Sequence, residues 1–346
     1  MEGWTDSELA LLMRPDGLAP SGCLTVLPSS LVEGGVHGLT PMAGRLEVDG
    51  DAVCFFPRFP FLAATSYSLV VALGDVEVWP ILRPARPGPA TSQVVGIFPS
   101  AGAVPLNLLK VYISFSAPMS EGEAAGAVHV RRVDTGEVLR GVFLPMDPEL
   151  WDPERRRLTM LLDPGRIKRG LAPHLEAGYP LIEGVPIVVV IDRGFRDAEG
   201  RPLAAGAERR YRVGAAVRTL IDPSVWECDQ PMAGTTDPLT LRFDRPLDRA
   251  LLGHSLQVAR AASGPISGSP ALGPDEQSWQ FVPRRAWQPG RHVVTIASRL
   301  EDLAGNSLAR VFDRDLTRPE DDSREMSPGT LEFDCVLPSH RPTGPP

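Results

Sequence analysis

Two turns of the same layout carry acidic and amide side chains that could bind a metal ion. Residues 197–203 read Asp-Ala-Glu-Gly-Arg-Pro-Leu, and residues 302–308 read Asp-Leu-Ala-Gly-Asn-Ser-Leu. Ca²⁺ prefers oxygen ligands of this kind. The candidate ligands are Asp302, Asn306, Asp192, Asp197 and Glu199. Neither turn has the dense alternation of acids that marks a calcium loop. We interpret both as structural turns without a metal, because an Asp that opens a turn commonly accepts bonds from its own backbone amides.

A tryptophan flanked by acids is the second group with chemical potential. The carboxylates nearest to Trp151 in the sequence belong to Asp147, Glu149, Asp152 and Glu154. Carbohydrate sites often combine an aromatic ring, on which a sugar stacks, with carboxylates that bind its hydroxyl groups. Two prolines in the same stretch indicate an exposed loop. Trp151 and Asp152 therefore form a candidate ligand loop, and the alternative is a turn whose indole folds onto the domain core.

The sequence contains no catalytic motif. Six histidines are scattered singly, and the G-x-S-x-G, Walker, G-x-G-x-x-G and H-E-x-x-H patterns are missing from the chain. A catalytic triad can be assembled from distant residues, but nothing in the sequence anchors one. We predict a protein that is not an enzyme and uses no cofactor.

The chain has four cysteines, Cys23, Cys54, Cys228 and Cys335. They have no C-x-x-C spacing, so a zinc site is not indicated, and three disulfide pairings are open. Cys23 and Cys54 lie in strand-like runs near the N-terminus. A bridge between Cys228 and Cys335 would tie the C-terminal tail to the first strand of the last repeat. Buried free thiols are the alternative, because cysteine packs well as a small apolar residue.

The charge balance limits the classes of partner. A net charge of −8 and a pI near 5.4 argue against a nucleic acid, whose phosphates require clustered Lys and Arg. No stretch approaches the ~20 apolar residues of a membrane-spanning helix. No signal peptide is visible, because the first residues are acidic where a signal peptide is basic. Read literally, the chain is cytoplasmic, and as a mature fragment it could be exported.

Short strands in a repeated series must position these groups. Residues 111–115 (VYISF) and 239–243 (LTLRF) alternate with a period of two, and a turn containing Pro and then Met or Leu follows each. A second match relates residues 53–58, 158–164 and 279–284. Self-similarity at a fixed spacing indicates a repeated structural unit. Three related units account for nearly the whole chain.

The repeat divides the chain into three units and a tail. Residues 1–84 form a divergent first unit, 92–213 the second, 214–318 the third, and 319–346 a mostly disordered tail with a possible strand at 331–333. The Pro-rich segment 83–92 is predicted to be a stiff linker. Residues 165–180 interrupt the second unit as an insertion, and loops of that length are often functional or mobile.

The repeated pattern resembles a known family. A strand ending in Phe-x-x-Pro-Met/Leu, then a central strand, then a strand closed by Asp-x-x-Gly-Asn/Arg-x-Leu, is similar to bacterial immunoglobulin-like domains of the surface-layer-protein type. The match is best in the third unit, good but interrupted in the second, and weak in the first. The resemblance implies seven-strand sandwiches that serve as spacers or adhesion modules on exported proteins. It implies no catalytic residue.

These observations predict an all-β chain of three tandem immunoglobulin-like β-sandwich domains. The predicted function is that of a non-enzymatic structural, spacer or adhesion protein of the bacterial cell envelope, exported to the periplasm or cell surface. The alternative is a glycan- or protein-binding module that uses residues 165–180 and the Trp151 loop. Its partner would be a cell-surface glycan or another envelope protein.

Overall fold

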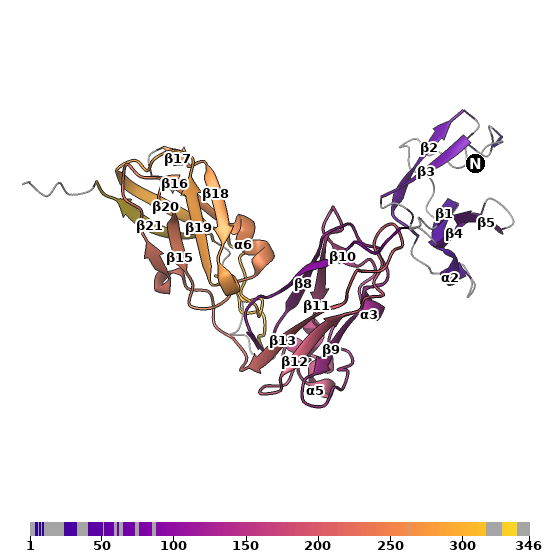
Figure 1. The fold of residues 1–346 in the computed structure, drawn as a ribbon, viewed down its shortest axis with the longest axis horizontal. Coiled ribbons are helices and arrows are strands. Elements are labelled where there is room, and N and C mark those ends of the chain that lie inside the picture. Colours follow the sequence, from indigo (N-terminus) through magenta and orange to yellow (C-terminus); the bar gives the residue numbers. More distant parts are fainter. Residues whose placement is uncertain are drawn as a thin grey trace, which may run out of the picture. The chain divides into compact units, whose positions relative to one another are not determined.

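Strands make up most of the regular structure of the chain (Figure 1). The structure, a computed structural model, describes residues 4–5, 7, 9, 24–32, 41–50, 52–58, 61, 65–72, 76–84, 88–261, 263–315 and 327–337. The chain divides into two structural units, which are described separately. The first comprises residues 1–93, 115–123 and 193–206, and the second comprises residues 94–114, 124–192 and 207–346.

The first unit contains a three-stranded antiparallel sheet and a separate hairpin. The sheet has the order β1 (Leu24–Pro28), β4 (Ser66–Ala72) and β5 (Val76–Leu82), and the hairpin pairs β2 (Gly44–Asp49) with β3 (Ala52–Pro57). The short helix α2 (Ser29–Val32) follows β1. Buried apolar side chains from β1, β3 and β4 form a common core: Leu24, Val26, Val53, Tyr67, Leu69 and Val71.

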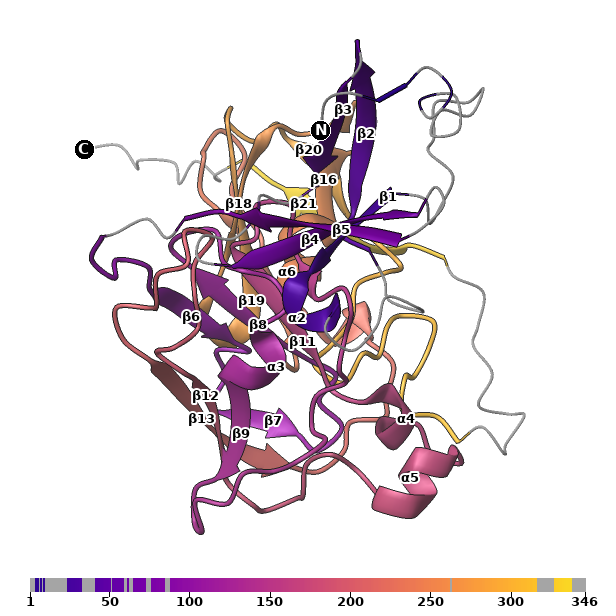
Figure 2. The ribbon, with the colours of Figure 1, turned by 90° about the vertical axis from the view of Figure 1, so that its right-hand side faces the viewer.

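The middle sandwich consists of two four-stranded sheets. One has the order β10 (Leu150–Trp151), β11 (Arg157–Leu161), β8 (Lys110–Phe115) and β6 (Val94–Phe98). The other has the order β7 (Ala103–Pro105), β13 (Ala207–Gly214), β12 (Ile187–Ile191) and β9 (Val128–Arg132). Figure 2 labels all of these strands except β10, which is labelled in Figure 1. Strand β7 pairs with β13 in parallel, and the other pairs are antiparallel.

The third sandwich also has two four-stranded sheets. One has the order β14 (Glu227–Asp229), β15 (Leu239–Arg242), β19 (Ser278–Pro283) and β18 (Gly268–Leu272). The other has the order β17 (Gly264–Pro265), β16 (Leu256–Arg260), β20 (Gly290–Ile296) and β21 (Gly329–Cys335).

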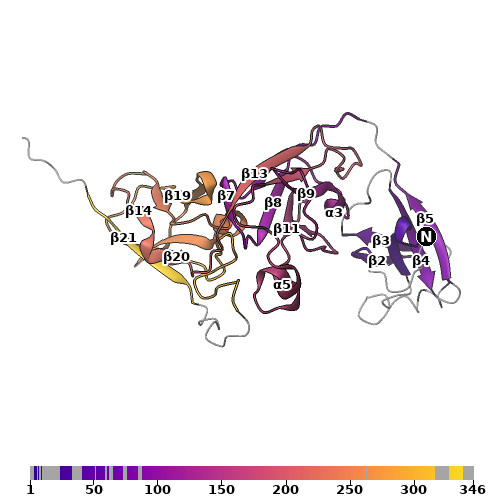
Figure 3. The same cartoon turned by 90° about the horizontal axis from the view of Figure 1, so that it is seen from below.

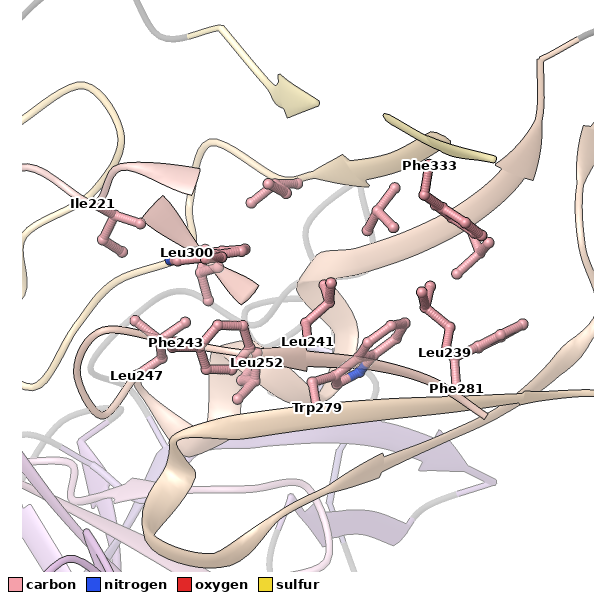
Figure 4. Packing of buried hydrophobic residues seen from close by; sticks show 14 of the residues in the cluster. Ile221, Leu239, Leu241, Phe243, Leu247, Leu252, Trp279, Phe281, Leu300 and Phe333 are labelled. Carbon is pink, nitrogen blue, oxygen red and sulfur yellow. The ribbon is translucent and has the colours of Figure 1, made fainter. Parts of the chain in front are cut away.

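Alternating side chains fill the space between the two sheets of the third sandwich (Figure 4). Leu239 and Leu241 of β15 lie beside Trp279 and Phe281 of β19, and Phe333 of β21 faces them from the other sheet. The rings of Trp279 and Phe281 are stacked with centroids 5.8 Å apart. Burying an apolar side chain of this size contributes about 1.5–3 kcal/mol, so the period-two pattern accounts for the core.

The strand order of the two sandwiches is that of the immunoglobulin fold, in which strands A, B, E and D face strands C, F and G. In the middle sandwich β6, β8, β11 and β10 take the first set of places, and β9, β12 and β13 the second. In the third sandwich β14, β15, β19 and β18 face β16, β20 and β21 in the same way. The predicted fold class is therefore confirmed.

The described strands of the first unit repeat part of this order. Its sheet β1-β4-β5 has the same sequential pairing as β16-β20-β21, and its hairpin β2–β3 corresponds to the pair β18–β19. These strands therefore match the last five strands of a sandwich, C to G. The repeat was recognised by two landmarks, the Pro-containing turn after strand B and the acidic turn. The strands described in this unit match C to G and do not include strand B, and the acidic turn is missing from its sequence. Its sequence match is therefore weak.

The C-terminal segment contributes to the third sandwich. The sequence places residues 319–346 in a mostly disordered tail, whereas residues 329–335 form β21 and pair in full register with β20. The possible strand predicted at residues 331–333 lies within β21, which is longer than the prediction because acidic and Pro-rich stretches flank it. Residues 316–326 and 338–346 lie outside the described part of the chain.

Helices in the second structural unit, which holds most of the middle and third sandwiches, are short. They are α3 (Ala124–Ala127), α4 (Pro164–Ile167), α5 (Ala172–Ala177), α6 (Arg249–Ser255) and two 3₁₀ turns, η1 (Pro223–Val225) and η2 (Pro274–Glu276). Figure 3 shows α5 beside the strands of the middle sandwich. Among the described residues, no helix has the length and apolar character needed to cross a membrane.

We expect Phe333→Ala to lower the free energy of unfolding of the third sandwich by about 3–5 kcal/mol, because it removes a buried ring and leaves a cavity. Phe333 lies 5.8 Å from the ring of Trp287. Chemical denaturation followed by tryptophan fluorescence measures the change. Glu332→Ala on the exposed face of the same strand is the control and should cost less than about 0.5 kcal/mol. Equal stability of the two variants would show that β21 is not part of the core.

Candidate functional site at the acidic turns

The first acidic turn is organised around the buried carboxylate of Asp197. Its Oδ1 accepts hydrogen bonds from the backbone N–H groups of Glu199 (2.9 Å) and Arg201 (3.0 Å). Its Oδ2 accepts from the Ser92 hydroxyl (2.7 Å) and from Nε of Arg201 (3.1 Å). Burial raises the pKa of Asp197, but the hydrogen bonds from Ser92, Arg201 and Glu199 outweigh it, so the pKa lies below its ordinary value.

The second turn repeats this arrangement around Asp302. Its Oδ1 accepts from the backbone N–H groups of Ala304 and Asn306, both at 2.9 Å. Its Oδ2 accepts from Nδ2 of Asn306 (3.0 Å) and from Arg245 (3.3 Å). Here burial dominates and raises the pKa of Asp302 above its ordinary value, despite the hydrogen bonds from Asn306 and the charge of Arg245.

In both turns, hydrogen-bond donors of the protein itself saturate the carboxylate oxygens of the first Asp. Each oxygen of Asp197 and Asp302 accepts two hydrogen bonds, which is the usual capacity of a carboxylate oxygen. Two further candidates of this region are also paired, Asp192 with His129 at 2.9 Å and Glu199 with Arg83 at 3.2 Å. The part of the chain that the structure describes holds no cluster of three His, Cys, Asp or Glu side chains placed for a metal ion.

Glycine is required at the centre of the second turn. Gly305 has φ of 78°, in the left-handed region that other residues rarely adopt. A Cβ at Gly305 would also lie 2.5 Å from Cδ2 of Leu109, a residue of the middle sandwich. The turn therefore packs directly against the preceding sandwich of the same structural unit.

The second turn also fastens the segment that leads from the middle to the third sandwich. Nδ2 of Asn306 donates to the carbonyl of Val217 (3.0 Å). Asn107 donates to the same carbonyl (2.9 Å) and accepts from the N–H of Val217 (3.0 Å). The N–H of Leu109 donates to the carbonyl of Leu303 within the turn (2.9 Å). The backbone of the connection is thus bound from both sandwiches.

The first turn holds its own upstream segment in a similar way. Besides the bond to Asp197, Ser92 accepts from the N–H of Ala204 (2.9 Å) through its carbonyl. Arg83 donates to both carboxylate oxygens of Glu199, at 3.2 and 3.3 Å. Arg83 and Ser92 are the ends of the predicted linker. Both acidic turns therefore contact the segment that precedes their sandwich.

Charged groups are buried where the middle and third sandwiches meet. Asp248 accepts from the Tyr112 hydroxyl (2.7 Å) and from Lys110 (3.2 Å), and Lys110 also donates to Glu301 (2.6 Å). Burial lowers the pKa of Lys110, but the charges of Asp248 and Glu301 outweigh it and raise it. Asp248 in addition caps helix α6 by accepting from the N–H of Leu251. This network links β8 to the third sandwich.

A second buried carboxylate, Glu276, lies at the same junction. Its oxygens accept from the backbone N–H (2.7 Å) and the hydroxyl (2.8 Å) of Ser100. The guanidinium of Arg249 lies 4.1 Å from the centre of the Phe98 ring, a cation–π contact. The cavity lined by these elements has a volume of only ≈ 10 Å³, about the space of one water molecule. The junction is closely packed.

The inserted segment 165–180 is part of this junction. It forms α4 and α5, and Arg166 ties it together by donating to four backbone carbonyls, those of Gly141, Ala177, Gly178 and Tyr179. At its end the Tyr179 hydroxyl donates to Asp313 of the third sandwich (2.8 Å). The sequence suggested a functional or mobile loop from the length alone, which says nothing of the contacts that fold it.

Asp313 accepts hydrogen bonds from residues of both sandwiches. Its side chain is 0% exposed and accepts from Asn107 (3.1 Å), Arg169 (3.3 Å), Tyr179 (2.8 Å) and Arg218 (2.8 Å). Burial raises the pKa of Tyr179, and the bond to Asp313 adds to the effect. Sequence reasoning missed Asn107, Asp248, Glu276 and Asp313, because their partners are distant in the chain; only Asp248 has a local signal, as a helix cap.

The predicted ligand loop lies at the edge of the middle sandwich. The indole N–H of Trp151 donates to Glu149 (2.8 Å), whose other oxygen accepts from the N–H of Ala124 (2.7 Å). Asp152 accepts from the N–H groups of Arg156 and Arg157, at 2.7 and 2.9 Å. Both predicted residues are half-buried. In the structure their polar groups close the turn between β10 and β11.

The cysteines that the structure describes are free thiols. Cys228 and Cys335 belong to the core region of the third sandwich, and Cys54 is half-buried. Burial raises the pKa of Cys228 to about 11, with smaller effects from Asp229 and from the neighbouring Cys335 thiol. Cys23 lies outside the described residues. The possible disulfides among Cys23, Cys54, Cys228 and Cys335 remain predictions.

No protein-family model matches this chain, and no curated protein matches its sequence. Among solved structures, the FN1–FN3 domains of chicken CNTN1 are 12% identical, with 90% of each chain covered and a TM-score of 0.23. A three-domain immunoglobulin structure of titin is 8% identical, covering 93% of this chain and 90% of that chain at a TM-score of 0.19. The S-layer protein rSbsC is 9% identical, covering 91% of this chain and 50% of that chain at 0.16. With TM-scores this low, the fold assignment depends on the strand order, and no function is transferred.

Acidification should affect Asp197→Asn and Asp302→Asn in opposite ways. The lowered pKa of Asp197 stabilises the fold above the ordinary pKa of ~4, and this stabilisation is lost as the pH falls through the folded-state value. The deficit of Asp197→Asn relative to wild type should therefore shrink on acidification. The raised pKa of Asp302 means that wild type gains stability as the pH falls, so the deficit of Asp302→Asn should grow. Urea unfolding at a series of pH values measures both deficits, and parallel changes would contradict the interpretation.

Proposed function

We propose that this chain is a non-enzymatic structural protein of the bacterial cell envelope, a spacer or adhesion element built from tandem immunoglobulin-like sandwiches. The observation that carries the proposal is the buried carboxylate of Asp313, which four donors bind at the junction of the middle and third sandwiches. A chain that only needed a flexible connection would have no use for a buried, fully bonded junction.

The energetics of the junction favour a fixed geometry. Each hydrogen bond contributes about 0.5–1.5 kcal/mol net, but leaving a buried charged group without its partner costs about 3–5 kcal/mol. Rotating the third sandwich would separate Asp313, Asp248 and Glu276 from partners in the middle sandwich. Such a rotation would expose several unpaired groups at once, so the two sandwiches should move as one body.

The proposed spacer is built from three modules joined in series. We assign modules to residues 1–84, 92–213 and 214–318, with β21 (329–335) as the last strand of the third module. The joined modules would hold their end loops at a set distance, which suits a spacer or an adhesion element. The proposed location is the periplasm or cell surface, and the proposed partner is another envelope protein.

A second candidate function is ligand binding at the Trp151 loop, with a cell-surface glycan or a protein as the ligand. It is favoured by the place of the loop at an outer edge of the middle sandwich, where Trp151 and Asp152 are only half-buried. A glycan array that loses its signal with Trp151→Ala would support glycan binding. An array without any signal for wild type would count against it.

Nuclear spin relaxation of the whole chain tests the rigid junction. In wild type we expect one rotational correlation time for the middle and third sandwiches. Asp313→Asn should separate the two values, because the neutral amide adds donors to a site already filled with donors. Asp229→Asn, an exposed carboxylate paired with Arg242, is the matched control and should change nothing. Two different correlation times in wild type would refute the proposed spacer mechanism.

The thiol state tests the proposed export. Protein isolated from the native cell should carry bridges if it passes through an oxidising compartment. Alkylation after denaturation, followed by mass analysis, counts the free thiols. Four free thiols would contradict both export and the possible disulfide bridges. In reduced protein, Cys228 should react slowly with alkylating agents at neutral pH until the chain is unfolded, because its pKa is raised to about 11.

A further inference from the structure

An edge strand of the middle sandwich is interrupted above an apolar cavity. Along the outer edge of β11, Trp151 pairs with Leu158 and Leu150 with Thr159. Further along the same edge, an isolated bridge joins Phe143 to Leu162. Residues 145–149 leave the sheet between these two contacts. Like a β-bulge, which often lies next to a functional site, such an interruption redirects side chains and ends the pairing of the strand.

The cavity beneath the interruption has a volume of ≈ 360 Å³. That value falls in the range of about 300–1,000 Å³ found for small-molecule pockets. Buried residues of β9, of β11 and of the segment between β9 and β10 line its floor: Val128, Val130, Val142, Leu158 and Met160. Three apolar side chains at its rim remain exposed, Val138 (49%), Met146 (36%) and Leu150 (37%). An apolar floor with an apolar rim suits the body of an apolar ligand.

Most charged groups of the lining are already bound. Glu149 accepts from the N–H of Ala124 and from the Trp151 indole, which fixes it as a cap on α3. His129 pairs with Asp192 (2.9 Å). Arg140 is exposed, and among the described residues no carboxylate forms an ion pair with it. The one charge free to pair with a ligand is therefore positive.

We propose that this cavity binds a small amphipathic anion, with its alkyl body between the sheets and its carboxylate at Arg140. A glycan fits less well, because the floor offers no side-chain partners for a row of hydroxyl groups. A cationic amphiphile would meet the unpaired Arg140 at the rim. This binding activity is independent of the proposed spacer role, since the cavity belongs to the middle sandwich alone.

Dodecanoate is the probe for this site, measured by isothermal titration calorimetry with the full chain below the critical micelle concentration. We expect saturable binding of one dodecanoate per chain. Dodecyltrimethylammonium, with the same alkyl chain and the opposite charge, should bind more weakly by up to about fivefold, as expected for an ion pair near the surface worth up to ~1 kcal/mol. Maltose should not bind.

Two variants locate the binding. Ala125 is exposed on α3 and lines the cavity, so Ala125→Trp should block it without disturbing the core and abolish dodecanoate binding. Arg140→Ala should weaken dodecanoate by up to about fivefold and should not weaken dodecyltrimethylammonium, because the variant removes an attraction for the anion and a repulsion for the cation. Arg285→Ala, at an exposed arginine of the third sandwich, is the matched control and should have no effect.

Thermal unfolding of each variant checks that the fold is intact. Should Ala125→Trp fail to fold, chemical-shift changes of the Met160 and Met146 methyl groups on adding dodecanoate to wild type replace it as the locating measurement. The proposal is overturned if dodecanoate does not bind, if Ala125→Trp binds it normally, or if both amphiphiles bind equally. It is also overturned if the shift changes lie outside the cavity.

Discussion

The second structural unit depends on carboxylates that are removed from water and remain fully bonded. Asp313, Asp248 and Glu276 are buried between the middle and third sandwiches, and each accepts hydrogen bonds from the middle sandwich. A buried charge is tolerated only when donors surround it. That condition places strict demands on geometry, because a small displacement leaves several charges unpaired together. An apolar interface of the same size would slide more easily, so the polar network specifies orientation as well as contact.

The two acidic turns show how one local motif serves different surroundings. Both use the first Asp to bind two backbone N–H groups and a side chain of the same turn. They differ in the partner that reaches Oδ2 from outside, the Ser92 hydroxyl for Asp197 and the Arg245 guanidinium for Asp302. Burial is the largest single influence on both pKa values, but it outweighs the opposing hydrogen bonds only at Asp302. The layout alone therefore predicts the shape of the turn and leaves the ionisation behaviour to the surroundings.

Sequence reasoning succeeded where the determinants are local. Period-two alternation at residues 239–243 predicted a strand whose inward side chains do form the core, and the matches among residues 53–58, 158–164 and 279–284 predicted a repeat. It failed where partners lie far apart in the chain. Asn107 and Asp313 are separated by 206 positions, and no periodicity relates them. The insertion at 165–180 was visible by length, but its role depends on Tyr179 meeting Asp313. The cavity above Met160 was equally hidden, because an interrupted strand looks like an ordinary loop in a sequence.

A joint built from turns has a consequence for tandem architecture. The bonds that shape each turn are internal, so the turn keeps its form whichever sandwich precedes it. The contacts that fasten it can then vary, as they do between Glu199 with Arg83 and Asn306 with Val217. A repeated unit of this kind can be joined in series without redesign of its fold, and only the few residues at the joint need to adapt. This explains why the two turns are similar in sequence while the residues that they contact outside the turn are not.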